Sequence, residues 1–294
     1  MLEGQSIESI SLKIKSQELK SEDVVKFFLD KIKNYNKDLN AIVSLRDETE
    51  IISEAKEKDR LFDNGNKIGL LHGMPLAIKD ITDVKKLPTS FGCREYKNNF
   101  PDEDSIISER LKKEGAIIIG KTNTTELAYG SQTSNRLFGS THNPYDLTKT
   151  AGGSSGGAAA AVSSGMLPLA DGTDMMGSVR NPAAYCNLYG FRPTPGLIPE
   201  KRVKSSNIKY PLLSTLGGIA RTPHELSIFL DAVSGRDERD PFSFDLENTF
   251  VNASMSEEDF REIKIGWLSN LRLLILKKKY SFTMIKSNKL YIAI

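Results

Sequence analysis

The segment AGGSSGGAAAAVSSGMLPLADGTDMMGSVRNPAAYCNLYGFRPT occupies residues 151–194 and is the most informative part of the chain. Glycines flank Ser154 and Ser155 on both sides, and an alanine-rich stretch with helical character follows them. Glycine permits backbone conformations that other residues avoid, and the start of a helix offers unpaired N–H groups. A further serine, Ser178, lies in a predicted tight turn after the strand-like residues 167–170.

Three interpretations of this segment compete on physical grounds. A flexible glycine–serine linker is disfavoured because strong secondary-structure signals adjoin both ends. A phosphate-binding loop would need the Walker or G-x-G-x-x-G pattern, and residues 151–194 contain neither. An acyl-transfer site would need a nucleophile, a base and backbone N–H groups for an oxyanion. Spacing alone does not choose among them.

Upstream of the segment, short apolar runs alternate with helical patterns. Residues 75–78 are a strand candidate that ends at Lys79. Residues 105–114 are predicted to form a helix ended by Gly115, and the apolar residues 116–119 a second strand. This alternation predicts an α/β fold with helices packed on the faces of a sheet.

The flanking regions add further helices. Ser21 is expected to cap a helix whose apolar residues recur at helical spacing up to Ile32. A short strand is expected at residues 41–45, followed by a polar helix through residues 51–61. Near the other end, Thr222–Pro223 begins a helix, because proline is favoured at the first helical position.

Composition narrows the class of protein. The 294 residues include 40 basic and 38 acidic side chains, so no basic field favours direct binding to nucleic acid. The two cysteines are too few for a disulfide framework or a zinc cluster. The N-terminus lacks the apolar core of a signal peptide, and no apolar run has the length of a membrane span. We therefore expect a cytoplasmic protein with no membrane contact.

Several ordered segments resemble the blocks of the amidase signature family. They are GMPLAIKDI at 73–81, GAIIIGKTNTTELAYGS at 115–131, FGSTHNPYD at 138–146, the glycine–serine segment itself and STLGGIART at 214–222. The family includes bacterial amidases, fatty acid amide hydrolases and the A-type component of glutamyl-tRNA amidotransferase. The resemblance covers roughly residues 5–267 and implies a mixed central β-sheet flanked by helices.

The resemblance implies a catalytic triad at Lys79, Ser154 and Ser178. Ser178 would be the nucleophile, Ser154 the proton relay and Lys79 the base, with a cis peptide at Gly153–Ser154. Lys79 acts as a base only when neutral, so burial would have to lower its pKa by several units. Ser178 would attack a carboxylic amide, form an acyl-enzyme and release ammonia or an amine before water completes hydrolysis.

The resemblance also assigns the residues around the nucleophile. The backbone N–H groups of Met175, Met176, Gly177 and Ser178 would hold the oxyanion. The supporting residues, which would orient the catalytic serines, are Ser155, Asp174 and Arg180. The commoner family sequence has two glycines before the serine, whereas this chain has Met176–Gly177, as some bacterial amidases do. No cofactor is implied, because the protein supplies base, relay and oxyanion donors.

Two other hydrolytic mechanisms are disfavoured by the sequence. His72 and His142 do not lie in a nucleophile-elbow context, which argues against a Ser–His–Asp triad. The three histidines form no ligand-spaced pair, so no metal is expected.

The C-terminal region departs from the family pattern. The resemblance fades just after residues 264–268, and family members are considerably longer than this chain. We therefore expect residues 1–267 to form the N-terminal part of an amidase signature domain, with a strand at 263–267. Residues 268–294 would be an atypical basic tail. The alternatives to a working amidase are an inactive truncated remnant and a partner-dependent protein of the amidotransferase A type. A homodimer or a partner chain would then supply the missing half.

Overall fold

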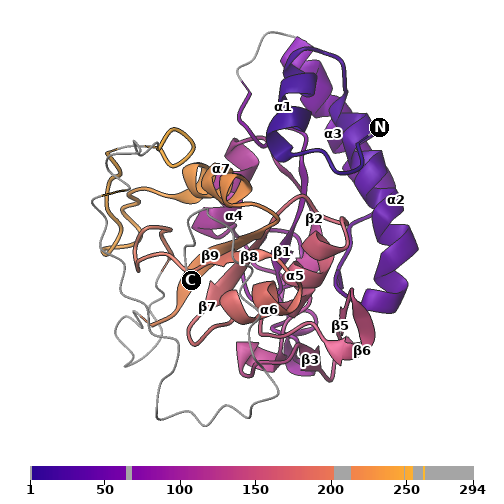
Figure 1. The fold of residues 1–294 in the computed structure, drawn as a ribbon, viewed down its shortest axis with the longest axis vertical. Helices are drawn as coiled ribbons and strands as arrows, with labels where there is room; N and C mark the ends of the chain where they lie inside the picture. The colour runs from indigo at the N-terminus through magenta and orange to yellow at the C-terminus, as the bar shows by residue number, and fades with distance from the viewer. Residues whose placement is uncertain (1, 64–67, 202–212, 248, 254–260, 262–294) are drawn as a thin grey trace. The chain divides into compact units, whose positions relative to one another are not determined.

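The computed structural model describes residues 2–63, 68–201, 213–247, 249–253 and 261 (Figure 1). The chain divides into two units, residues 1–251 and 252–294, and the fold described below is that of the first unit. The strand expected at 263–267 and the tail expected at 268–294 lie outside the described residues.

Helices and strands alternate along the first unit. The α-helices are α1 (Ile7–Lys15), α2 (Ser21–Leu39), α3 (Glu48–Asp63), α4 (Ile106–Lys113), α5 (Gly156–Ser163), α6 (Arg180–Tyr185) and α7 (Pro223–Val233). The strands are β1 (Pro75–Lys79), β2 (Ile117–Thr122), β3 (Ser134–Asn135), β4 (Gly139–Ser140), β5 (His142–Asn143), β6 (Asp146–Thr150), β7 (Ala170–Asp174), β8 (Tyr189–Phe191) and β9 (Thr215–Ala220). Short 3-10 helices occupy Arg94–Tyr96 and Glu126–Ala128. The predicted α/β class is confirmed.

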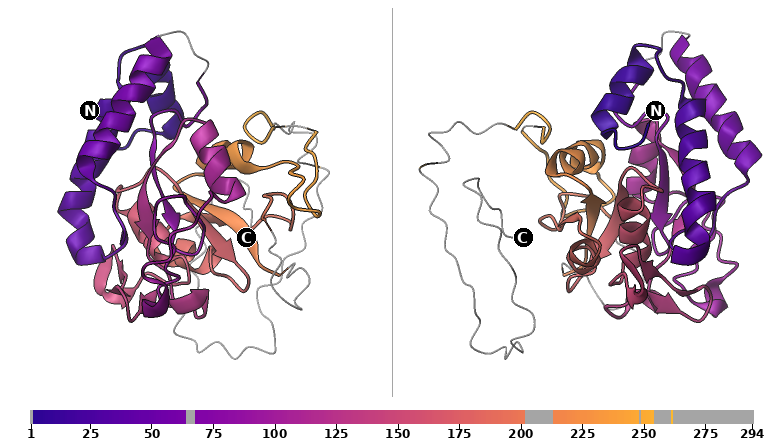
Figure 2. Two further views of the ribbon diagram at one scale, coloured as in Figure 1. Left: turned by 180° about the vertical axis from the view of Figure 1, so that it is seen from behind. Right: turned by 45° about the vertical axis from the view of Figure 1, so that its right-hand side comes forward.

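Two groups of strands form the centre of the fold. β1 and β2 pair in parallel, from Pro75 opposite Ile117 to Lys79 opposite Thr122. β9 lies between β7 and β8 and pairs antiparallel with both. β1 also contacts β7, and Figures 1 and 2 show these central strands side by side. Parallel and antiparallel pairings therefore both occur, as the expected mixed sheet requires.

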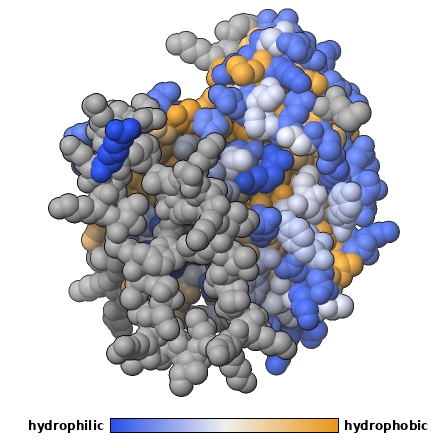
Figure 3. Space-filling view, viewed as in Figure 1, coloured by the Kyte–Doolittle hydropathy of each residue, from blue (hydrophilic) through white to orange (hydrophobic). Residues whose placement is uncertain are grey.

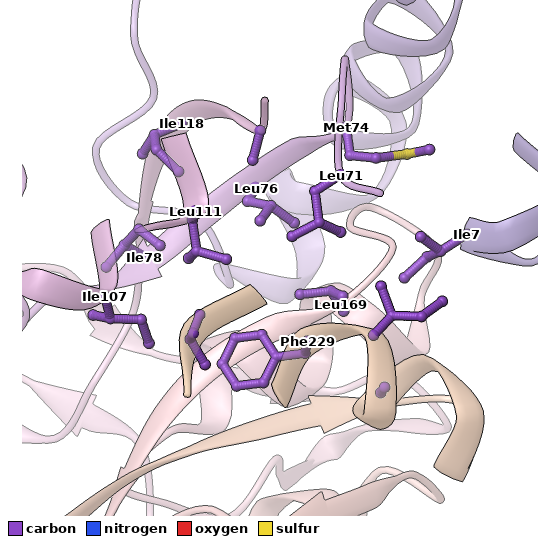
Figure 4. Packing of buried hydrophobic residues seen from close by; sticks show 14 of the residues in the cluster. Ile7, Leu71, Met74, Leu76, Ile78, Ile107, Leu111, Ile118, Leu169 and Phe229 are labelled. Atoms are coloured by element: carbon purple, nitrogen blue, oxygen red, sulfur yellow. The ribbon is translucent and has the colours of Figure 1, made fainter. Parts of the chain in front are cut away.

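Alternation along the strands divides the core into two clusters. On β1, Leu76 and Ile78 join one cluster, whereas Ala77 joins the other. Because successive strand residues point to opposite faces, each cluster covers one face of the strands. Figure 4 shows the first cluster, in which Leu111 of α4 and Phe229 of α7 pack near β1 and β2. The alanines of α5 fill the second cluster.

The amphipathic helix α2 shows where the sequence prediction of a cap was wrong. Ser21 is the first residue of the helix, and its buried hydroxyl has no partner among the described residues. The carboxylate of Asp59 in α3 instead accepts hydrogen bonds from the N–H groups of Ser21 (2.7 Å) and Glu22 (3.2 Å). A side chain distant in sequence therefore provides the acceptor that a local cap usually provides.

Other local predictions had mixed outcomes. Thr222 does cap α7, and its side chain accepts a hydrogen bond from Glu225 N–H. Residues 41–45 form no strand, only a bridge between Ile42 and Thr122 beside β2. The strand near 167–170 begins at Ala170, later than expected.

The described surface is mainly polar on the face shown in Figure 3, with hydrophobic side chains scattered between hydrophilic ones. Apart from Ser21, the polar residues of α2 are exposed or partly exposed, while the apolar residues Val24, Val25, Phe28, Leu29 and Ile32 are buried. No helix in the described part of the chain is both long and apolar enough to cross a membrane.

Candidate active site

The amine of Lys79 is the centre of the candidate site. Lys79 ends β1 and is completely buried. Its Nζ lies 2.7 Å from Ser154 Oγ, 2.8 Å from Ser155 Oγ and 2.8 Å from Thr173 Oγ1. An ammonium can donate to all three hydroxyls, but a neutral amine has two N–H donors and one lone pair. In the neutral form, therefore, one of these hydroxyls donates its proton toward the amine.

Burial changes the proton affinity of this amine. Desolvation lowers the pKa of Lys79 to about 7, although the negative charges of Asp171 and Asp174 oppose the shift. Loss of water penalises the charged form of a buried lysine, which explains the direction. A substantial fraction of Lys79 is thus neutral near pH 7, as a base that accepts a serine proton must be.

The two adjacent serines lie where the chain enters α5. The peptide Gly153–Ser154 is cis, as the family resemblance implied. Thr133 supports this segment because its hydroxyl donates to Ser154 O (3.2 Å) and accepts from Gly156 N–H (2.8 Å). Ser154 and Ser155 are both completely buried, so their hydroxyls reach solvent only through neighbouring groups.

Ser178 lies in the turn between β7 and α6 and is partly exposed. Its carbonyl accepts a hydrogen bond from Ser155 N–H (3.1 Å), which joins the two serine segments. Within the described residues its hydroxyl makes no hydrogen bond, so the expected link from Ser178 to Ser154 is not formed in this structure. Catalytic hydrogen bonds often form only once substrate is bound.

The turn before Ser178 presents main-chain donors. Met175 and Met176 are exposed, and among the described residues nothing accepts from the N–H groups of Met175, Met176 and Ser178. Gly177 N–H differs, because it donates to Asp174 Oδ1 at 2.7 Å. Within the described part of the chain, three of the four predicted oxyanion donors are therefore free, and the fourth is engaged by a carboxylate.

Asp174 holds this turn together. Its buried carboxylate accepts from the N–H groups of Gly177, Val179 and Arg180, and the Arg180 guanidinium binds it through Nε and Nη2, each at 3.0 Å. Burial raises the pKa of Asp174, but the hydrogen bonds from Arg180 and the turn outweigh it, so the pKa lies below its ordinary value. Asp174 and Arg180 thus bind the turn that carries Ser178, and their role in orienting the catalytic serines stays a prediction.

Two residues near Lys79 were not identified from the sequence. Thr173 accepts from the amine, and Asp171 Oδ1 accepts from the main-chain N–H of Lys79 (2.9 Å). Both belong to β7 and are two residues apart, so they face the same side of the strand. Extending the expected strand at 167–170 by four residues would have placed them on that face.

The ring nitrogens of His72 and His142 pair with main-chain oxygens of other segments. His72 Nε2 is 3.2 Å from Lys58 O, and His142 Nδ1 is 2.7 Å from Leu147 O. In the described part of the chain neither imidazole bonds to Lys79 or to a serine of the glycine–serine segment. The geometry therefore gives no support to a Ser–His–Asp arrangement.

Comparison with known proteins supports the same interpretation. The family model described as Amidase matches residues 23–288. The acylamidase of Rhodococcus erythropolis is 37% identical over 269 residues, which are 91% of this chain and 55% of that protein. The A-type component of the glutamyl-tRNA(Gln) amidotransferase of Saccharolobus solfataricus is 36% identical over 259 residues, 88% of this chain and 52% of that protein. The chain spans about half the length of these curated relatives.

Solved structures agree with the sequence comparison. A bacterial aryl acylamidase of the amidase signature enzymes superposes with a TM-score of 0.80 at 33% identity, over 84% of this chain and 51% of that one. The peptide amidase of Stenotrophomonas maltophilia superposes with a TM-score of 0.75 at 29% identity, over 82% of this chain and 50% of that one. Because the family model matches most of this chain, residues 23–288, we conclude that the chain belongs to the amidase signature family.

Proposed function

We propose that this chain is an amidohydrolase that cleaves carboxylic amides through an acyl-enzyme on Ser178. The observation that carries the proposal is the position of the Lys79 amine, buried and bonded to the Ser154 hydroxyl at 2.7 Å. A serine hydroxyl becomes nucleophilic when a base removes its proton, and a neutral Lys79 is such a base. The similarity to acylamidases and a peptide amidase supports an amide as the substrate.

The proposed reaction conserves protons at each step. Ser178 Oγ attacks the amide carbonyl carbon, and its proton passes through the Ser154 hydroxyl to Lys79 Nζ. The N–H groups of Met175, Met176 and Ser178 stabilise the oxyanion of the tetrahedral intermediate. The intermediate collapses when the proton returns through Ser154 to the leaving nitrogen, which departs as ammonia or an amine. Water then attacks the acyl-Ser178 ester while Lys79 accepts its proton through Ser154. The proton returns to Ser178 Oγ as the carboxylic acid departs, which regenerates the enzyme.

A partner-dependent role is the second candidate. Relatives that match this chain include amidotransferase components of the A type, and the chain spans about half of their length. In this alternative a partner chain, or a second copy of this one, supplies the rest of the substrate pocket. The Met-Met-Gly-Ser sequence at 175–178, which some bacterial amidases share, favours a small-molecule amide over a tRNA-linked substrate.

Covalent labelling tests the proposal without knowledge of the substrate. We expect a fluorophosphonate to add one phosphonyl group to the 294-residue chain, and peptide mass mapping to place it on Ser178. Unfolding the chain in urea before exposure is the control, because it separates the serines from Lys79. Folded protein that stays unlabelled, or a label on another serine, would contradict the proposed nucleophile.

The labelling rate should also depend on pH in a defined direction. Because the pKa of Lys79 is lowered to about 7, the neutral base predominates above that pH and the ammonium below it. We expect the rate to be half-maximal near pH 7, to level off above it and to fall about tenfold for each pH unit below it. A rate that stays constant from about pH 5 to about pH 9 would show that Lys79 is not the titrating base.

A further inference from the structure

Asp171 is a buried carboxylate that the mechanism above does not use. It is the second residue of β7 and is 1% exposed. Its Oδ1 accepts the main-chain N–H of Lys79 at 2.9 Å, at the point where β1 ends beside β7. Its Oδ2 is buried without a hydrogen-bond partner in the described part of the chain. A buried carboxylate oxygen without a partner is costly, so its surroundings must compensate its charge.

The other buried charges near Asp171 have partners of their own. Lys121 of β2 donates to Thr82 O and Thr89 Oγ1. Asp80, next to Lys79, accepts from the Ser90 hydroxyl and from the N–H groups of Ser90 and Gly92. The side chains of Lys121 and Asp80 therefore bind residues of the loop that follows β1.

Asp174, the remaining carboxylate of β7, is committed to the turn before α6. Asp171 differs from both of these carboxylates. One of its oxygens accepts the main-chain N–H of Lys79, where β1 ends beside β7, and the other has no hydrogen-bond partner among the described residues.

We propose that Asp171 is a positioning residue for Lys79: it holds the end of β1 and supplies the negative charge that balances the proton which Lys79 takes from the serines. This inference rests on the proposed function, in which Lys79 becomes an ammonium during each turnover. A buried ammonium without a counter-charge would be strongly disfavoured, and proton transfer from serine would be opposed.

The electrostatics agree with this assignment. Burial lowers the pKa of Lys79, and Asp171 is the first of the charges that raise it again. Burial also raises the pKa of Asp171 to about 6. The hydrogen bond from Lys79 N–H and the positive charges of Lys121 and Lys79 act in the opposite direction and lower it. Asp80 contributes to the pKa of Lys121 but is not among the charges that shift Lys79.

That difference provides a matched pair of variants. Asp171→Asn keeps a carbonyl oxygen to accept Lys79 N–H but removes the charge, and Asp80→Asn removes a neighbouring buried charge whose hydrogen bonds come from Ser90 and Gly92. The titration midpoint of Lys79 would be followed by the ¹⁵Nζ signal of lysine-labelled protein, assigned with Lys79→Met. We expect Asp171→Asn to lower the midpoint by about one pH unit or more, and Asp80→Asn to leave it nearly unchanged.

The pH dependence of fluorophosphonate labelling should shift together with the Lys79 midpoint. In Asp171→Asn the acidic limb of fluorophosphonate labelling should move to lower pH by the same amount. The limiting rate at high pH should fall about tenfold, because a less basic amine accepts the serine proton less readily. An unchanged Lys79 midpoint in Asp171→Asn, or an equal shift in Asp80→Asn, would overturn the inference.

A reciprocal measurement applies if Asp171→Asn does not fold. Coupling between two titrating groups acts equally on both, so removal of the Lys79 charge must affect Asp171. In Lys79→Met we expect the ¹³Cγ signal of Asp171 to titrate about one pH unit higher than in the unmutated chain, and an unchanged midpoint would overturn the inference. Neither titration needs an active protein. If the Lys79 and Asp171 midpoints shift as expected but fluorophosphonate never labels the folded protein, the proposed function is refuted and the link between Asp171 and Lys79 stands.

Discussion

Ser178→Ala should lower amide hydrolysis by about 10⁵-fold and abolish fluorophosphonate labelling, because removal of a catalytic nucleophile costs about 10⁴–10⁶-fold in serine hydrolases. The substitution removes one partly exposed oxygen that makes no hydrogen bond within the described residues. The fold should therefore persist, with an unfolding midpoint close to that of the unmutated chain. Steady-state kinetics on a small aryl amide, together with thermal unfolding, would measure both effects.

The neighbouring serines provide matched controls. Ser154→Ala removes the relay that bonds to Lys79, and we expect a loss of about 10²–10⁴-fold, the usual contribution of general acid–base catalysis. Ser155→Ala leaves the Ser154 bond to Lys79 in place, and we expect about a tenfold loss. Labelling that survives in Ser178→Ala but not in Ser154→Ala would identify Ser154 as the nucleophile and reverse our assignment.

Gly157→Ala should destabilise the first unit by more than about 3 kcal/mol, or prevent folding, because a Cβ at this position has no space. It would lie 2.3 Å from Asn123 N and 2.6 Å from Ala41 O and Asn123 O, all atoms of the main chain. Gly157 is in α5, where alanine is by itself favoured over glycine by about 1 kcal/mol. Any destabilisation therefore reports the steric conflict between α5 and the adjacent chain.

Gly165 is the control for this prediction. It has a φ of +74°, and a Cβ there would meet no atom within 4 Å. Gly165→Ala should cost only the strain of a left-handed alanine, about 1–2 kcal/mol. Urea unfolding of the two variants would compare their free energies, and a Gly157→Ala chain as stable as Gly165→Ala would show that α5 can move away from residue 123.

Predictions from local sequence succeeded where local interactions are sufficient. The helices predicted at 105–114 and from Thr222 both form, and the side chains of Ser105 and Thr222 cap them. The apolar runs at 75–78 and 116–119 became the paired strands β1 and β2. These features depend on hydrogen bonds and periodicity within about four residues, which a sequence displays directly.

Local prediction failed where a distant segment supplied the partner. Asp59 replaces the expected cap at Ser21, because α3 packs against α2 and brings a carboxylate to its first N–H groups. Residues 41–45 had the pattern of a strand, but the main chain there makes only scattered hydrogen bonds beside β2. Neither outcome is encoded within the segments concerned.

The sequence by itself determined the α/β class, the family and, through the resemblance, the identity of Lys79, Ser154 and Ser178 as candidates. Only the tertiary structure decided whether Lys79 could act as a base, since a lysine at the end of an exposed strand would stay charged at neutral pH. Packing of β7 and α5 around β1 removes water from the amine, lowers its pKa to about 7 and brings Asp171 and Thr173 beside it. Desolvation depends on every surrounding segment at once, and no single motif contains it.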